Sequence, residues 1–116
     1  TRTVFTAEKR RTQSQATVTA EPFAGAHLTG YEIHTGRTTV QGAPFCTLAD
    51  GTPEGCVQGQ VFGTYLHGPL LPKNPQVADY LIAQAFDRRG DALELAPLDD
   101  AVELEANRVM AKRLGV

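Results

Sequence analysis

Cysteine, net charge and long apolar runs are all scarce in this sequence, and each scarcity excludes a class of protein. The two cysteines, Cys46 and Cys56, are too few for a disulfide framework and lack the spacing of a metal site, so we expect a reducing, cytoplasmic setting. The formal net charge of -2 gives no electrostatic footprint for nucleic acid or an anionic membrane. No apolar run approaches the ~20 residues of a membrane-spanning helix.

The 116 residues suffice for one domain with a modest core, and the hydrophobic fraction of 41% is ordinary for a globular chain. Neither a P-loop nor a Gly-x-Gly-x-x-Gly motif occurs, and we expect no cofactor. The first residue, Thr1, is not methionine, so we expect either a processed chain or a piece of a longer protein. A catalytic partner would then lie outside this sequence.

The first half of the chain favours strands, because β-branched, aromatic and aliphatic residues gather there between turn residues. Residues 1–13 are the exception: they are polar and carry three adjacent cations, which predicts a solvated arm. A turn rich in glycine and proline is predicted over 50–55, and Gly59 predicts a hairpin-like kink in the last strand. The predicted strands cover residues 15–20, 27–34, 44–48 and 57–66.

The second half changes to a helical period. A proline-bounded loop over 69–75 leads into a helix from Pro75 to about Arg88, with Asn74 as its N-cap and Gly90 at its end. A second helix is predicted from about Asp99 to Leu114. We therefore predict an α/β fold in which two helices pack on a sheet. The apolar stripe of the first helix comprises Val77, Leu81, Ile82, Ala85 and Phe86.

His67 stands where the last predicted strand meets Gly68 and Pro69. Histidine is the side chain best suited to move a proton near neutral pH, and ligands bind beyond strand ends in open α/β sheets. His67 is therefore a candidate catalytic residue, and the alternative, which is commoner for a lone histidine, is that it only caps a turn or satisfies a backbone carbonyl.

Glu32 and His34 lie two residues apart on a predicted strand, so they share one face. If that strand neighbours the strand of His67, two imidazoles and a carboxylate converge. We expect no metal there, because no His-x-x-x-His spacing or cysteine cluster occurs. Neither Cys46 nor Cys56 follows a strand–turn–helix elbow, so the sequence offers a base without its nucleophile.

Two motifs carry a resemblance to a known family. Residues 30–38 (Gly-Tyr-Glu-Ile-His-Thr-Gly-Arg-Thr) and 63–68 (Gly-Thr-Tyr-Leu-His-Gly) resemble the C-terminal half of CobB/CobQ-type class I glutamine amidotransferase domains, and residues 8–12 resemble the segment before the first motif. The resemblance implies a class I glutamine amidotransferase-like (flavodoxin-like) sheet with flanking helices, of which residues 1–116 are the C-terminal portion. It also implies that the nucleophilic cysteine lies upstream.

The resemblance assigns roles and partners. His67 matches the catalytic histidine of the family, and Glu32 and His34 match a motif that supports the active site. The substrate is then glutamine, and the ammonia passes to a synthetase. Residues 67–81 and the tail from Pro97 resemble GatD-type glutaminases, which work with a MurT-like subunit to amidate lipid II.

The first motif instead resembles cobyric acid synthases, which carry a fused ATP-dependent synthetase domain, and Ile33 stands where GatD-type sequences usually have Asn. The GatD-like assignment is preferred. A non-catalytic scaffold of the same fold is the alternative from another class. We also expect residues 68–74, with Lys73 and Asn74, to lie at the rim of the active site and contact the synthetase partner. The alternative is a rigid connector that contacts no partner.

Overall fold

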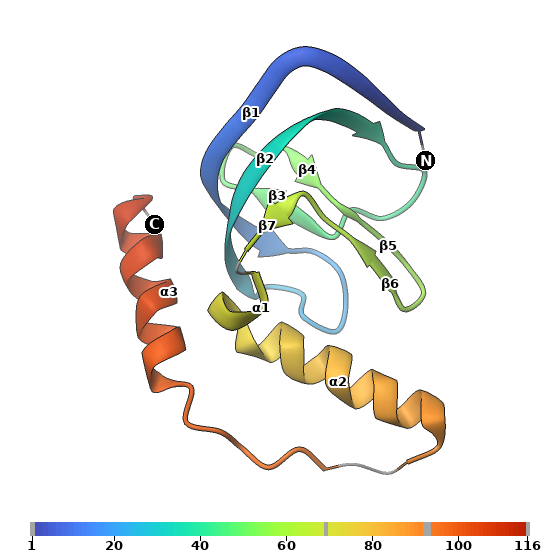
Figure 1. Cartoon of the computed structure of the whole chain (residues 1–116), viewed down its shortest axis with the longest axis vertical. Coiled ribbons are helices and arrows are strands. Elements are labelled where there is room, and N and C mark those ends of the chain that lie inside the picture. The colour runs from blue at the N-terminus through green and yellow to red at the C-terminus, as the bar shows by residue number, and fades with distance from the viewer. Residues whose placement is uncertain (1, 69, 92–93, 116) are drawn as a thin grey trace.

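The computed structural model describes residues 2–68, 70–91 and 94–115, and in these ranges strands come first and helices last (Figure 1). Pro69, part of the motif at the end of the His67 strand, lies outside the described residues. No helix in the described ranges is long and apolar enough to cross a membrane. The mixed α/β character predicted from the sequence is confirmed, and the strand pairs of the described residues are antiparallel.

A long curved hairpin forms the frame of the molecule (Figure 1). Strand β1 (Arg2–Val18) pairs with β2 (His27–Thr39) along almost its whole length. The predicted arm over 1–13 is therefore wrong for residues 2–13, which form a strand, although most of these residues are exposed as expected. The basic run fits a strand because its side chains alternate between faces: the guanidinium of Arg10 bonds to Glu32 on one face, and that of Arg11 bonds to Tyr31 on the other.

Short strands complete the sheet in the order β4-β3-β1-β2-β7. Strand β3 (Cys46–Leu48) lies inside the predicted 44–48 segment, and β4 (Pro53–Glu54) occupies part of the predicted turn. The expected single strand over 57–66 is wrong. It divides into a hairpin, β5 (Cys56–Gln58) with β6 (Val61–Gly63), and a separate strand β7 (Leu66–His67). Gly59, with φ of +59°, makes the hairpin turn.

The two long helices agree with the sequence-based predictions, and one short helix was not predicted. Helix α1 (Leu70–Lys73) stands where a loop was predicted, while α2 (Pro75–Arg89) and α3 (Ala101–Arg113) match their predictions. Helix α2 ends at Gly90 in the left-handed conformation, as expected. In Figure 1, α2 runs below the strands and α3 stands beside the long hairpin.

The core lies between one face of the sheet and the start of α2. Of the predicted stripe on α2 only Val77 is buried, whereas Leu81 and Ile82 are 38% and 44% exposed. The helix instead packs through Tyr80, whose ring meets Phe23 edge-on at 4.8 Å. The buried apolar residues of the core are Ala16, Val18, Ala20, Leu28, Phe45, Cys46, Leu48, Leu66 and Val77.

Asn74 connects the helices to the sheet. Its amide accepts from Thr29 N–H at 3.2 Å and donates to the carbonyls of Thr29 at 3.1 Å and Leu70 at 2.7 Å. It thus continues the edge of β2 beyond β7, and Asn107 of α3 donates to it in turn. Asn74 occupies the N-cap position of α2, but its side chain makes no capping bond. Because Asn74 is 0% exposed, the expectation that it contacts a partner is wrong.

Candidate active site

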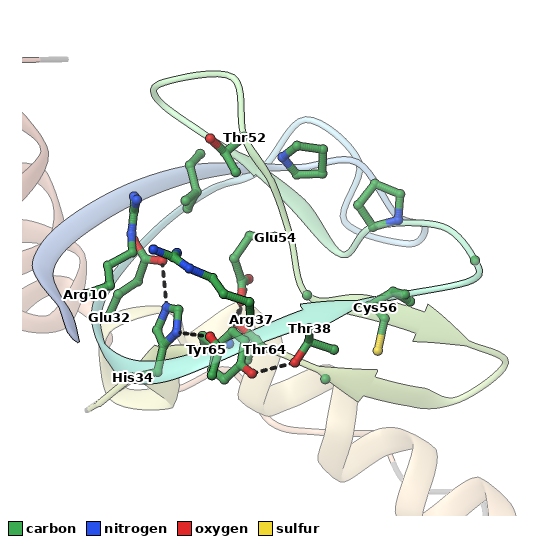
Figure 2. Close-up of a pocket in the computed structure, with 18 residues that line it drawn as sticks. Arg10, Glu32, His34, Arg37, Thr38, Thr52, Glu54, Cys56, Thr64 and Tyr65 are labelled. Atoms are coloured by element: carbon green, nitrogen blue, oxygen red, sulfur yellow. Dashed lines mark hydrogen bonds and ion pairs between the residues drawn. The ribbon is translucent and has the colours of Figure 1, made fainter. Parts of the chain in front are cut away.

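A pocket of about 600 Å³ opens between the β1–β2 hairpin and the β4–β7 segment (Figure 2). Its walls combine charged and hydroxyl-bearing side chains with backbone at Gly36, Gly55 and Gly63. The charged and hydroxyl-bearing side chains at its wall are Arg10, Glu32, His34, Arg37, Thr38, Thr52, Glu54, Thr64 and Tyr65.

Glu32 is a buried acidic residue of this pocket, with 2% of its surface exposed. Its carboxylate accepts from Arg10 Nε at 2.9 Å and from the hydroxyl of Ser14. The two partners lie on β1 and share the face of Glu32, because Thr12 pairs with Glu32 and Arg10 pairs with His34. The Glu32 hydrogen bond raises the pKa of the Arg10 guanidinium, so Arg10 stays charged throughout the physiological range.

Both ring nitrogens of His34 and one face of its ring make contacts. Its Nδ1 lies 2.8 Å from the carbonyl of Gly36, and its Nε2 lies 3.5 Å from Glu32 Oε1. The ring stacks on Tyr65 with centroids 4.0 Å apart and planes 9° apart, and the Tyr65 hydroxyl hydrogen-bonds to Thr38 (Figure 2). The structure therefore brings Glu32 and His34 together, as the sequence predicted, and joins them to the segment that precedes His67.

His67 lies on the opposite side of the sheet. Residues directly opposite one another in an antiparallel pair share a face, and the register pairs His67 with Tyr31 while Glu32 pairs with Leu66. The expected convergence of both imidazoles with the carboxylate is therefore wrong, although β7 and β2 are neighbours. His67 is exposed, and its backbone is fixed in the β2–β7 ladder.

The cysteines have the character of packing residues. Cys46 is fully buried, and its thiol lies 3.3 Å from Glu54 Oε2. Burial, reinforced by the neighbouring Glu54 carboxylate, raises the pKa of this thiol far above its usual range, which suppresses the nucleophilic thiolate. Cys56 is half-buried at the pocket wall. In the described part of the chain no three His, Cys, Asp or Glu side chains are grouped to hold a metal ion.

Glu54 is a further residue of the pocket that the sequence did not predict, because it falls in the segment expected to be a turn. The residue is 5% exposed, and its carboxylate accepts from the Thr64 hydroxyl at 2.8 Å and from the backbone N–H of Tyr65. An acidic residue inside a glycine- and proline-rich segment carries no periodic signal, so only the pairing of β4 with β3 reveals its position.

Comparison with known proteins assigns the chain to a family. The model of the CobB/CobQ-like glutamine amidotransferase domain matches residues 1–75. The chain belongs to this family. The matched region contains both motifs, Glu54 and His67, and it ends at the first residue of α2.

Among curated relatives, the chain is 32% identical to the GatD subunit of lipid II isoglutaminyl synthase (glutamine-hydrolyzing) from Staphylococcus aureus, across 94% of this chain and 48% of that protein. It is 44% identical to a probable cobyric acid synthase from Thermococcus kodakarensis, across 58% of this chain and 15% of that protein. A cobyric acid synthase from Methylocella silvestris is 39% identical across 73% of this chain and 18% of its own length. The chain thus spans about half of GatD and under a fifth of these synthases.

Proposed function

We propose that residues 1–116 are the histidine-bearing, C-terminal portion of a glutamine amidotransferase domain that releases ammonia from glutamine. The observation that carries the proposal is His67: an exposed imidazole on a backbone fixed against β2, inside the region that matches the family. A rigid strand is a good support for a group that must meet a reacting atom within a fraction of an ångström.

The chemistry needs a cysteine that this chain does not supply. His67 takes the proton of an upstream thiol, and the thiolate attacks the side-chain amide carbon of glutamine. His67 then gives the proton to the departing nitrogen, which leaves as ammonia, and a glutamyl thioester remains. Water deprotonated by His67 hydrolyses the thioester to glutamate and returns the thiol. The burial of Cys46 supports this assignment of the nucleophile to an upstream segment, which would also complete the sheet as a flavodoxin-like fold.

Glu32 and His34 have a supporting role in this proposal. They lie behind the sheet face of His67 and reach it through the stacked ring of Tyr65. Their part is to hold the segment before β7 in place, since neither side chain lies on the face that His67 presents.

For the acceptor we prefer a GatD-like role, in which a MurT-like synthetase subunit uses the ammonia to amidate lipid II in the cytoplasm. The match to GatD across 94% of the chain, through both long helices, supports this choice. The higher identity to a cobyric acid synthase, 44% across 58% of this chain, supports the alternative, a glutaminase domain fused to its synthetase. In either case Lys73, next to the buried Asn74, is the residue of the 68–74 segment that we expect to contact the synthetase.

Glutamine hydrolysis by the full-length protein tests the proposal. Replacing His67 with alanine should lower kcat by ~10²-fold or more, the scale of a lost general base. His27→Ala is the matched control, because His27 is also exposed on a strand but starts β2, away from β7. Wild-type activity in the His67 variant would refute the base assignment, whereas no glutamine hydrolysis by the wild-type full-length protein would favour the scaffold alternative.

A further inference from the structure

We propose that Glu54 is a positioning residue for His67, an inference that rests on the proposed role of His67 as the base. Residues 64 and 65 lie between β6 and β7, outside both strands. Their backbone leads directly into β7, so whatever fixes them also fixes the direction in which the imidazole of His67 points. In Figure 2 the side chain of Glu54 extends toward Thr64 and Tyr65.

Side chains hold the two amides that precede His67. The N–H of Tyr65 donates to Glu54 Oε1, and the N–H of Leu66 donates to Thr64 Oγ1 at 2.9 Å. The same Thr64 hydroxyl donates its own proton to Glu54 Oε2 at 2.8 Å. One carboxylate therefore anchors both consecutive amides, one directly and the other through a hydroxyl.

The anchor itself is rigid. Glu54 pairs with Cys46 in the β3–β4 ladder, and its carbonyl accepts from Phe45 N–H at 3.0 Å. Gly55 follows with φ of +70°, and a Cβ at that position would lie 2.4 Å from the carbonyl oxygen of Gly63. This close approach brings the β4 end against the end of β6, which is why the carboxylate reaches the segment before β7.

The site requires an acceptor at both oxygens. Three donors surround the carboxylate: the Tyr65 amide, the Thr64 hydroxyl and the Cys46 thiol. A glutamine amide has only one acceptor atom, so its NH₂ group would face one of these donors in a buried site. The donor left unpaired would turn away, and the backbone before His67 would move with it.

Variants of the residues around Glu54 can distinguish a positioning role of its carboxylate from a purely structural one. Cys46→Ala removes one hydrogen bond of the same carboxylate but leaves the bonds to Thr64 and Tyr65. Glu54→Gln and Thr64→Val disturb those bonds, and Thr64→Ser restores the hydroxyl. A purely structural role for Glu54 predicts that all destabilising variants act alike.

The experiment measures kcat and KM for glutamine in the full-length protein, together with amide hydrogen exchange at residues 65 and 66. We expect Glu54→Gln and Thr64→Val to lower kcat by ~10-fold or more, since displacements of ~1 Å cost up to ~10²-fold. KM should change little, and exchange of both amides should accelerate. Thr64→Ser and Cys46→Ala should keep kcat within about threefold of wild type.

Wild-type kcat and slow exchange in Glu54→Gln would overturn the inference while His67→Ala remains inactive and the proposed function stands. If Glu54→Gln does not fold, Thr64→Val decides alone, because valine has the shape of threonine. An active His67→Ala would overturn both the base assignment and the positioning role. A kcat loss in Cys46→Ala equal to that in Thr64→Val would assign Glu54 to packing instead.

Discussion

Replacing Asn74 with alanine should be among the most destabilising single changes in this chain. The substitution leaves three backbone groups without their partners: the N–H and carbonyl of Thr29 and the carbonyl of Leu70. An abandoned buried polar group costs about 1–3 kcal/mol, and water can reach only the part-buried Leu70 carbonyl. We therefore expect a loss of about 3–5 kcal/mol in the free energy of unfolding, a large part of the total stability of a small domain.

Urea denaturation followed by circular dichroism measures this loss. With a slope of about 1–3 kcal/mol per molar urea, the midpoint should fall by roughly 2 M. Asn107→Ala is the matched control: it removes the donor to Asn74 and to the Lys73 carbonyl but leaves the bonds to Thr29, and it should cost about 1–2 kcal/mol. A loss below about 1 kcal/mol for Asn74→Ala would refute the reasoning that this amide completes the edge of β2.

Three further predictions concern the same sheet. Thr29→Val should be neutral or stabilising by up to about 1–2 kcal/mol in the same urea assay, because the buried Thr29 hydroxyl has no hydrogen-bond partner among the described residues; a loss above about 1 kcal/mol would contradict this. Gly30→Ala should cost about 1–3 kcal/mol and lower glutamine hydrolysis, since its Cβ would stand 2.9 Å from that of Leu66 in β7; an active, equally stable variant would show that β7 yields. Because burial raises the pKa of the Cys46 thiol, the folded state holds the thiol proton more tightly than the unfolded state. The contribution of this proton to stability is complete below the unfolded thiol pKa of about 8.5 and falls by up to about 1.4 kcal/mol per pH unit above it. Wild type should therefore lose stability between about pH 8 and about pH 10 by an amount that Cys46→Ala does not show.

The sequence predicted the elements whose signals are local. Helix α2 begins at Pro75 and ends at Gly90, where proline and glycine act on the backbone of their own turn. The strand character of residues 2–13 was missed because it depends on a distant partner: Arg10 becomes an inward-facing residue only once Glu32 lies opposite. The exposure of Leu81 and Ile82 on the α2 stripe was not predicted, because periodicity shows that a helix face is apolar and does not show which residues pack on it.

The candidate site divides in the same way. Glu32 and His34 share a face because of strand alternation, a property that the sequence carries directly. The position of His67 on the other face depends on the register between β2 and β7, and a shift of one residue would reverse it. Asn74 and Glu54 satisfy backbone groups of segments remote in the sequence, so neither role has a sequence pattern.

Covalent trapping of the nucleophile tests the central claim most directly. The full-length protein is treated with a glutamine-analogue electrophile, and the labelled residue and the labelling rate are determined by mass spectrometry for wild type and His67→Ala. The account predicts a label on a cysteine upstream of residue 1, none on Cys46 or Cys56, and labelling slower by ~10²-fold without the His67 imidazole. A label on Cys46 or Cys56, or equal rates in the two proteins, would contradict it.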